Sequence, residues 1–337
     1  MTSWTNRFDR RAMIGRSLYN PAFSHIYVEK GARDYPLTGE IIGRFPRSEL
    51  IEINHYKDVF NRPRQDFNTQ IMSRNLILAV RNGAFFYEGS EICRRGCFYK
   101  SAQIINCIYG CDYCYLRGAY ESGNVVAFVN SNDYFNAASA IVKGGANALF
   151  CLSYETDLLA ADEIFRFTSG WVEFARRTPA AFFEIRTKTG RADILKKHEP
   201  VENMLIEWSF AAGHKDCFNE NGTPGEDARI AAIYDAIGVG WNAAICIEPV
   251  VLGGNWTSDV KTLIDKVEKA FGVKKLKKIS AGGLRIPTVY YKRLVKTCVD
   301  PLPYARLEEN GGVRSYGPEA ETMIKKTVGE LAGIECA

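Results

Sequence analysis

Three cysteines stand close together in the stretch NCIYGCDYCYLRGAY, residues 106–120. Cys107, Cys111 and Cys114 are separated by three and two residues, so one compact loop can bring three thiolates to one centre. Thiolates are the natural ligands of iron–sulfur clusters. Zinc usually takes four ligands, and none of the four histidines (25, 55, 198 and 214) is near this loop. The motif therefore predicts a [4Fe–4S] cluster with one iron free of protein ligands; a zinc site or merely buried cysteines are the alternatives.

An alternation of strands and helices must position this loop. Apolar, β-rich runs occur at residues 101–109, 124–130, 146–153, 180–187, 203–210, 240–251 and 277–286. Helical patterns lie between several of them, at residues 131–145, 161–178, 225–238 and 258–272. Such alternation is typical of a parallel sheet with right-handed crossovers, and about six units predict an open or partial barrel. Sites in such sheets lie at the carboxyl ends of the strands. Another strand and turn are predicted at 76–86, and 1–20 is expected to be a polar arm.

Composition limits the function classes. The chain has 337 residues, is 46% hydrophobic and carries a net charge of +4. It has no apolar run long enough to span a bilayer and no secretory signal, so we expect a cytoplasmic protein without a membrane partner. Arginines are frequent in the first hundred residues, where they either contact DNA phosphates or form a solvated surface. They are Arg7, Arg10, Arg11, Arg16, Arg44, Arg47, Arg62, Arg64, Arg74, Arg81, Arg94 and Arg95.

The remaining cysteines give weaker signals. Cys93 and Cys97 form a second C-x3-C just before the cluster motif and are either a thiol donor, redox pair or metal site, or two loop cysteines without a catalytic role. Four further cysteines, at positions 217, 246, 298 and 336, are isolated, and free cysteine is commonly buried as a small apolar side chain. We assign no role to those four.

Several segments resemble the spore photoproduct lyase family of the radical S-adenosylmethionine (SAM) superfamily. The cluster motif itself, CDYCYLRG at 111–118, is similar to the family signature. Further similar segments are HIYVEKGARDYPLTGEII (25–42), LILAVRNG (76–83), RTKTGR (186–191), IEWSFAAG (206–213) and CIEPVVLGGNW (246–256). The resemblance covers about residues 22–290.

This resemblance implies an α/β fold, a partial (β/α)6 barrel at 101–290. An amino-terminal extension (1–100) would pack on the barrel, and a carboxyl-terminal segment (291–337) would follow it. In the superfamily the open iron chelates SAM, and an electron from a donor such as flavodoxin or ferredoxin cleaves SAM to a 5′-deoxyadenosyl radical. The implied cofactors are therefore a [4Fe–4S] cluster and SAM, in which the cofactor does the difficult chemistry.

The resemblance also suggests which residues hold SAM. Tyr113 and Tyr115 flank the last cysteine, where an aromatic residue of the superfamily lies near adenine; loop packing is the alternative. Lys188, Ser209 and Thr156 fall where the family uses a lysine, a serine and a small hydroxyl residue at strand ends. Lys188 would pair with the SAM carboxylate, and the hydroxyls would bond to ribose or carboxylate. Without the resemblance, ordinary strand-end polar groups would be the simpler interpretation.

The catalytic segment departs from the family. The lyases have a hydrogen-donating cysteine in a Phe-Glu-Ala-Ala-Cys-Thr-Ser-Asp segment, and the matching residues 150–157 read FCLSYETD. The donor position falls on Tyr154, and Cys151 lies three residues earlier, on the opposite face if the strand continues. We therefore predict Tyr154, Cys151 and Tyr115 as catalytic residues, with Tyr154 either donating hydrogen or shaping a pocket. Nearby strand-end carboxylates that a substrate could meet are Glu155, Asp157, Glu184 and Glu248.

Four functions fit these features. The first is a radical SAM isomerase that converts 5-Nα-glycinylthymidine to 5-Cα-glycinylthymidine in phage thymidine hypermodification, which would act on DNA in the host cytoplasm and require base flipping. The second is a lyase that repairs spore photoproduct with a displaced thiol donor. A radical SAM enzyme for a small molecule or peptide is the third, and a non-catalytic iron–sulfur or zinc DNA-binding module is the fourth.

Overall fold

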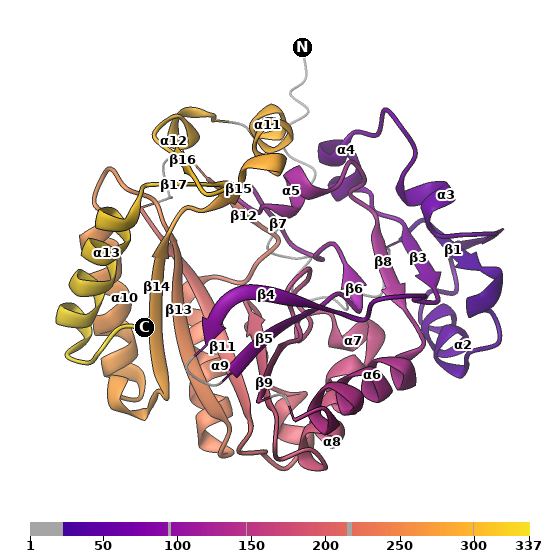
Figure 1. Cartoon of the computed structure of the whole chain (residues 1–337), viewed down its shortest axis with the longest axis horizontal. Coiled ribbons are helices and arrows are strands. Elements are labelled where there is room, and N and C mark those ends of the chain that lie inside the picture. Colours follow the sequence, from indigo (N-terminus) through magenta and orange to yellow (C-terminus); the bar gives the residue numbers. More distant parts are fainter. Residues whose placement is uncertain (1–22, 94–95, 146, 214–217, 299) are drawn as a thin grey trace.

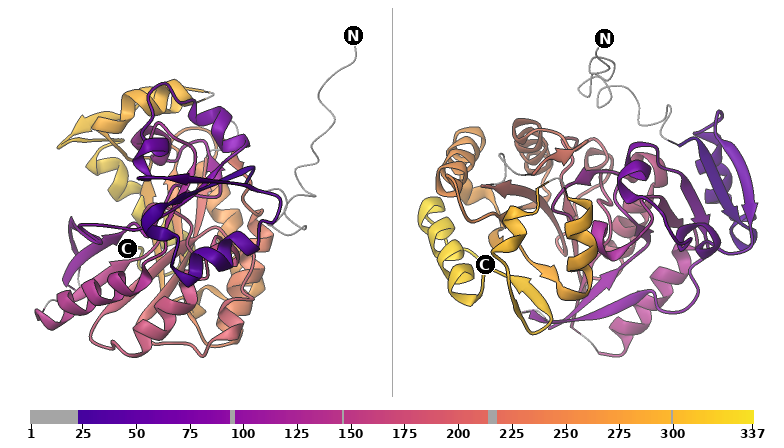
Figure 2. Two further views of the ribbon diagram at one scale, coloured as in Figure 1. Left: turned by 90° about the vertical axis from the view of Figure 1, so that its right-hand side faces the viewer. Right: turned by 90° about the horizontal axis from the view of Figure 1, so that it is seen from above.

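The computed structural model describes residues 23–337 except 94–95, 146, 214–217 and 299 (Figure 1). It is an α/β structure with two main sheets, and the predicted amino-terminal arm lies outside the described residues. Seen from above, the molecule is an open crescent with β1 and β2 near one end and α13 near the other (Figure 2).

The larger sheet has seven strands. In spatial order they are β14 (Lys278–Gly283), β13 (Asn242–Val250), β11 (Met204–Ala212), β10 (Phe182–Thr187), β9 (Ala148–Cys151), β5 (Gly96–Ser101) and β4 (Phe86–Cys93). All neighbours are parallel except the edge strand β4, which is antiparallel to β5. The six parallel strands follow chain order and the sheet has two free ends, as expected for a partial barrel that does not close.

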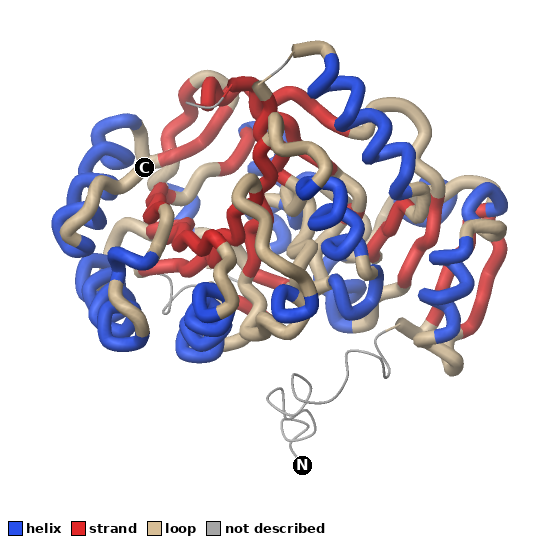
Figure 3. Tube along the Cα trace, turned by 90° about the horizontal axis from the view of Figure 1, so that it is seen from below, coloured by secondary structure: helices blue, strands red, loops and turns tan. Residues whose placement is uncertain are grey.

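Helices cover one face of this sheet (Figure 3). They are α6 (Ser131–Lys143), α7 (Asp162–Phe165), α8 (Phe167–Arg176), α9 (Glu226–Gly238), α10 (Trp256–Ala270) and α13 (Pro318–Ala332). The strand residues that pack in the hydrophobic core, such as Phe183, Ile206 and Ile245, alternate with charged residues such as Glu184 and Glu207. Because side chains of a strand alternate between faces, the core face meets the helices and the charged face lines the inside of the crescent.

The second sheet contains five strands. Its order is β2 (Glu49–Ile53), β1 (His25–Glu29), β3 (Leu76–Ala79), β8 (Val125–Phe128) and β6 (Ile104–Ile105). Short helices accompany it: α2 (Pro36–Gly43), α3 (Lys57–Phe60) and α4 (Phe67–Met72). The run predicted at 124–130 is a strand, but it pairs with β3 rather than joining the larger sheet. The run at 101–109 is likewise divided between the end of β5 and the short β6.

Small elements complete the structure. They are β7 (Gly110–Cys111), α5 (Leu116–Ala119), β12 (Glu220–Asn221), β15 (Ile286–Pro287), α11 (Thr288–Thr297), α12 (Leu302–Ala305), β16 (Glu308–Asn310) and β17 (Val313–Ser315). Strand β5 crosses the domain boundary expected at residue 100, and α11 crosses the one expected at 290. Those boundaries stay predictions. The outer edge of β14 is met by Cys336, which forms a parallel bridge with Ile279. Within the described residues, no helix combines the length and apolar character that a bilayer span requires.

Helix α11 packs directly on α5, the helix that follows the cluster motif. A side chain at Gly118 would clash with the backbone carbonyl oxygen of Tyr290, and its Cβ would lie 3.1 Å from Cβ of Leu294. Arg293 ties the same contact, because its Nη1 donates to the Gly118 carbonyl at 2.9 Å. The absence of a side chain at Gly118 thus permits the carboxyl-terminal segment to lie against the cluster loop.

We expect Gly118→Ala to lower the free energy of unfolding by about 1–3 kcal/mol, because an overpacked contact must open. The measurement is urea unfolding followed by circular dichroism. Gly39→Ala is the matched control: Gly39 is an exposed helical glycine with no atom within 4 Å of a new Cβ, so its replacement should be neutral or slightly stabilising. Equal stability of the two variants would contradict the packing of α11 on α5.

Candidate active site

The cluster loop follows the short strand β6 and is anchored at its start by Asn106. This side chain is buried, and its amide nitrogen donates to the carbonyls of Ser122 and Asn124, each at 2.7 Å. The backbone of Asn106 has φ 68°, a left-handed conformation that asparagine tolerates better than most residues. The chain is therefore turned sharply just before Cys107.

Arg74 holds the next part of the loop. Its guanidinium donates to the carbonyl oxygens of Ile108 and Tyr109, the latter at 2.7 Å. Burial lowers the pKa of Arg74 to about 10, while the nearby thiols Cys107 and Cys111 oppose that shift. Arg74 therefore places a positive charge beside the cysteines, as expected around an anionic cluster.

Of the three cysteines, Cys111 is buried, and Cys107 and Cys114 are half-buried. Burial raises the pKa of Cys107 to about 12 and also raises the pKa values of Cys111 and Cys114. Such thiols bind a metal cluster only with loss of their protons, which the cluster irons would compensate. Among the described residues, no three Cys, His, Asp or Glu side chains gather as ligands of a single metal ion. In a cubane each thiolate binds a different iron, so the donor set fits a cluster bound at three corners.

A buried ion pair fixes the second half of the loop. Arg117 lies 3.7 Å from Asp112, and both side chains are at most 5% exposed. Asp112 also accepts from the backbone N–H of Asn219 at 3.0 Å and from the Asn221 amide at 3.2 Å. These bonds extend the two-residue pairing of β7 with β12, which brings residues 219–221 against the cluster motif.

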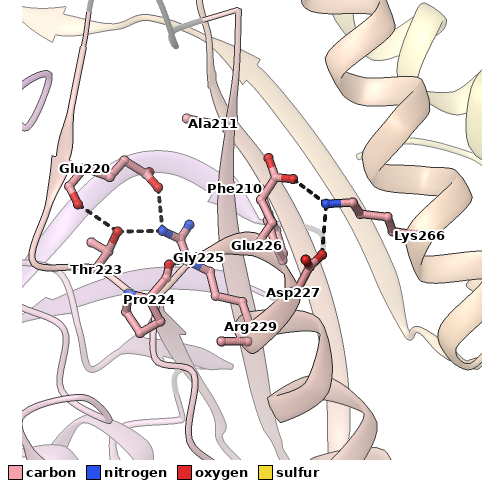
Figure 4. A pocket seen from close by; sticks show the side chains of 11 residues that line it. Phe210, Ala211, Glu220, Thr223, Pro224, Gly225, Glu226, Asp227, Arg229 and Lys266 are labelled. Atoms are coloured by element: carbon pink, nitrogen blue, oxygen red, sulfur yellow. Dashed lines mark hydrogen bonds and ion pairs between the residues drawn. The ribbon is translucent and has the colours of Figure 1, made fainter. Parts of the chain in front are cut away.

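Glu220 is the centre of the charge network on that segment, and Figure 4 shows it beside Arg229 and Thr223. Its carboxylate lies 2.9 Å from the Lys188 ammonium and 2.5 Å from the Arg229 guanidinium, and it accepts a hydrogen bond from the Tyr113 hydroxyl. Burial would raise the pKa of Glu220, but Lys188 and Arg229 outweigh that effect and hold it well below its usual range. Glu220 and Arg229 also line a cavity of about 400 Å³.

Lys188 and Tyr113 both contact Glu220, and their predicted roles in binding SAM stay predictions. The Lys188 ammonium also lies over the Tyr113 ring, 5.6 Å from its centroid. Asp157 fixes the backbone below them, because its carboxylate accepts from the Lys188 N–H at 2.6 Å and from the Thr187 hydroxyl at 2.7 Å. Asp157, a candidate pocket carboxylate by sequence, is thus a positioning residue for Lys188.

The two predicted hydroxyl ligands differ in their surroundings. The Thr156 hydroxyl is buried and has no hydrogen-bond partner among the described residues. An unpartnered buried hydroxyl is costly, and a ligand that bonds to it would remove the cost. Ser209 lies on β11, and its carbonyl oxygen accepts from Arg229 at 2.9 Å. Arg229 therefore connects Ser209 to Glu220.

Tyr154 lies in a turn at the inner side of the crescent. Its hydroxyl oxygen accepts from the Lys100 ammonium at 3.2 Å, and the ammonium is 4.4 Å from the ring centroid. The Tyr115 hydroxyl donates to the Tyr154 carbonyl at 2.9 Å, and the two rings are 5.8 Å apart. The predicted catalytic tyrosines are thus in contact with each other.

Cys151 lies on the same inner face as Lys100, the residue that contacts Tyr154, whereas strand alternation placed Cys151 and Tyr154 on opposite faces. Strand β9 ends at Cys151 and residues 152–155 form a turn, so the alternation does not continue to Tyr154. Cys151 pairs in register with Lys100 on one side and with Glu184 on the other, which places it on the charged inner face. Burial raises the pKa of Cys151 to about 12, so the group is a thiol at neutral pH.

Arg186 organises the inner face. It lies 3.0 Å from Glu184, 2.7 Å from Glu207 and 3.2 Å from Glu248. Lys278 is 2.9 Å from Glu207, and although burial would raise the pKa of Glu207, Arg186 and Lys278 hold it below its usual value. Glu184 and Glu248 are therefore ion-pair partners within the sheet.

Sequence reasoning missed the residues that position the site. Glu220, Arg229 and Arg74 lie far from the cysteine motif in sequence and have no local signal of their role. Lys100 had a weak one, because it lies at the end of a strand shortly before the cluster motif. Cys97 is exposed, the side chain of Cys93 and all of Cys217 lie outside the described part, and the eight cysteines that can be assessed are free.

A model of the family described as spore photoproduct lyase matches residues 19–316. The chain belongs to the spore photoproduct lyase family. This agrees with the cysteine motif and the strand-end residues found above. Comparison with curated proteins gave no significant match.

Solved structures show the same fold. A spore photoproduct lyase mutant is 18% identical, with a TM-score of 0.77, and the match covers 93% of this chain and 98% of that one. A mutant described with a dinucleoside spore photoproduct is 17% identical with a TM-score of 0.78 and the same coverage. A third, described with bound AdoMet and dinucleoside spore photoproduct, is 18% identical with a TM-score of 0.77, again over 93% and 98%. At these identities the likeness establishes the fold.

We expect Cys107→Ala, Cys111→Ala and Cys114→Ala each to lose the cluster, because a cubane held at two corners is exposed to solvent and exchange. The measurement is iron and sulfide content, with visible absorbance, after anaerobic reconstitution. Cys336→Ala, a free cysteine at the far edge of β14, is the matched control and should load fully. Stoichiometric zinc without sulfide in the wild type would contradict the cluster assignment.

Replacing Glu220 by Gln should cost about 3–5 kcal/mol in the free energy of unfolding, since it leaves two buried cations without their counter-charge. The pKa of Glu220 is depressed in the fold, so its stabilisation is present above about pH 4.3 and is lost as the pH falls further. The difference between wild type and variant in urea unfolding should therefore shrink in acid. Glu226→Gln is the control: its pair with Lys266 is 29% and 38% exposed and worth less than about 1 kcal/mol.

Proposed function

We propose that this member of the spore photoproduct lyase family is a radical SAM enzyme that acts on a modified thymine base in DNA. The observation that carries the proposal is the grouping of the three cysteines, the unpartnered Thr156 hydroxyl and the Tyr115–Tyr154 contact at one end of the sheet. The similar solved structures of spore photoproduct lyase with AdoMet and a dinucleoside spore photoproduct support it.

Cys107, Cys111 and Cys114 would hold the [4Fe–4S] cluster, and Arg74 would offset its negative charge. A reduced cluster with bound SAM supplies a 5′-deoxyadenosyl radical, the hydrogen-abstracting agent of this superfamily. Thr156 would donate or accept at SAM through its hydroxyl. Lys188 would reach the SAM carboxylate only by sharing or leaving Glu220, so Glu220 sets how readily that ammonium is released.

The chemistry we propose is isomerisation of 5-Nα-glycinylthymidine to 5-Cα-glycinylthymidine. The bond between the thymine methylene carbon and the glycine nitrogen breaks, and a bond between that methylene carbon and the glycine Cα forms. One hydrogen atom is removed from the glycine Cα and one is returned to the glycine nitrogen, so substrate and product have the same composition. Where Tyr154 returns the hydrogen, an electron from the external reductant and a proton from solvent restore its phenol. Such a reaction has no need of the thiol that a lyase places at the position of Tyr154.

Tyr154 is suited to return that hydrogen. The Lys100 ammonium donates to the phenol oxygen, so the phenolic hydrogen points elsewhere. The Tyr115 hydroxyl holds the carbonyl of the same residue, which fixes the turn. Tyr115 is then a positioning residue for Tyr154 within the catalytic group.

A second candidate is a lyase with Cys151 as its donor. Cys151 is a buried thiol on the inner face, in register with Lys100, and Lys100 contacts Tyr154. The Cys151 thiol and Tyr154, which occupies the family's donor position, thus share Lys100 as a neighbour. The two candidates therefore differ in which of two neighbouring side chains returns hydrogen.

The arginines of the first hundred residues support DNA binding less than their number implies. Arg44 donates to the carbonyl of Ile164 at 2.8 Å and Arg74 holds the cluster loop, so both have internal partners. Others, such as Arg7 and Arg94, lie outside the described residues. Arg62 is exposed and remains a candidate phosphate contact.

The decisive experiment offers the anaerobically reconstituted protein two DNA substrates, one UV-irradiated as in spores and one with 5-Nα-glycinylthymidine. With SAM and a reductant present, we expect 5′-deoxyadenosine to form with the glycinylated DNA. A new nucleoside with the same mass as 5-Nα-glycinylthymidine should form from that DNA only, detected by chromatography with mass spectrometry. Tyr154→Phe should cleave SAM but not form that nucleoside, whereas Cys151→Ala should form it.

Restored thymidine from the irradiated DNA, lost in Cys151→Ala, would establish the lyase and refute the isomerase. Cleavage of SAM without a new product from either DNA substrate would leave the cluster assignment standing and refute action on these two bases.

A further inference from the structure

A separate cavity of about 220 Å³ lies where the two main sheets approach each other. The residues that follow β2 and β3 contribute Tyr56, Phe60 and Arg81 to its lining. Tyr87 comes from β4, Tyr120 from the end of α5 and Glu155 from the turn after β9. Except for Tyr87, these residues lie near the carboxyl ends of strands or beyond them, where ligands of parallel sheets bind.

The lining offers flat aromatic faces. Phe60 and Tyr120 are in edge contact, with ring centroids 5.2 Å apart. The Arg81 guanidinium lies 5.7 Å from the Tyr87 ring centroid, and Tyr87 is 47% exposed. Aromatic rings with an adjacent arginine are the surfaces on which nucleic-acid bases stack.

Two polar groups of opposite character face the same space. Glu155 accepts from the Tyr120 hydroxyl at 2.6 Å through Oε2, and Oε1 has no partner among the described residues. Arg81 donates from Nε to the Ala84 carbonyl at 3.0 Å and from Nη2 to the Tyr87 hydroxyl, which leaves Nη1 available in the part of the chain that the structure describes. A free acceptor and a free donor match a base edge that carries an N–H beside a carbonyl.

Glu155 also connects the cavity to the reacting segment. It stands between Tyr154, which contacts Lys100, and Thr156, whose hydroxyl is unpartnered. Ala102 and Ile105, which also line the cavity, lie in the segment between β5 and Cys107, and Ile105 ends β6. A group bound to Glu155 is therefore held by the residue that stands between the proposed hydrogen donor and the proposed SAM ligand.

We propose that this cavity is a nucleobase pocket that receives the pyrimidine base of the substrate nucleotide after it is flipped out of the DNA. Glu155 accepts from the base N–H, Arg81 donates to a neighbouring carbonyl, and Tyr87 stacks on the ring. The proposal rests on the proposed function, because it takes DNA as the substrate. It adds which surface recognises the base and makes Glu155 and Tyr87 specificity-determining residues.

The test compares two labelled single-stranded oligonucleotides that differ at one central position, thymidine or an abasic site. Binding to the reconstituted protein with SAM is followed by fluorescence anisotropy. The wild type should bind the thymidine strand about tenfold to a hundredfold more tightly, the usual effect of stacking one base on an aromatic side chain. In Tyr87→Ala and Glu155→Gln that preference should fall to within about threefold, while the affinity for the abasic strand stays as in the wild type.

Tyr234→Ala is the matched control. Tyr234 is 54% exposed on α9, outside the cavity lining, so its loss should leave the preference intact. Full cluster content and an unchanged circular dichroism spectrum in each variant show that the fold survives. An undiminished preference in both pocket variants overturns the nucleobase pocket and leaves DNA action standing. A wild type that binds neither strand overturns the DNA substrate itself, and the pocket with it.

Discussion

The cluster loop depends on side chains that come from outside it. Eight residues from Cys107 to Cys114 contain one two-residue strand and no helix, so the loop cannot fix three thiols by its own backbone pairing. Arg74, Asn106 and the Asp112–Arg117 pair supply the missing bonds. Each of these anchors joins the loop to residues outside it, so the cysteine geometry is a property of the whole fold. The short pairing of β7 with β12 then brings Glu220 to the same place.

Two separate networks of ion pairs neutralise buried charges in this structure, one centred on Glu220 and one on Arg186. Around Glu220, one carboxylate satisfies Lys188 and Arg229 beside the predicted SAM site. On the inner face, Arg186 bridges three carboxylates in the middle of the sheet. Buried ion pairs add little net stability, because desolvation offsets attraction, but losing one partner is costly. A polar inner face is therefore more consistent with a substrate-facing surface than with a device for stability.

Much of the fold followed from sequence pattern. The helices at 131–143, 226–238 and 256–270 were predicted nearly to their ends, and the partial barrel is confirmed by the sheet order and the similar solved structures. The strand at 125–128 was found but assigned to the wrong sheet. An apolar run such as VVAF fits either sheet equally, and the choice of partner depends on contacts that distant residues make.

The site was less accessible to sequence reasoning for a related reason. The cysteines can be identified in the sequence by their spacing. Glu220, in contrast, meets Tyr113 only because two short strands pair across more than a hundred residues of chain. The turn at 152–155 ended an alternation that a strand would have continued, so Cys151 was expected on the wrong face. Placement of Lys188, Thr156 and Ser209 relied on family resemblance, and their roles stay predictions.

An open barrel leaves the outermost strand with unsatisfied backbone groups, which is a route to association between copies. In this structure the carboxyl-terminal residues cover part of the outer edge of β14. Cys336 bridges to Ile279, and the Ala337 N–H donates to the Ile279 carbonyl at 2.9 Å. The final residues thus occupy the position that a strand of a neighbouring molecule would take. Removal of these few residues would expose the outer edge of β14 for pairing with another molecule. Its first effect would be aggregation at high protein concentration rather than loss of catalytic activity.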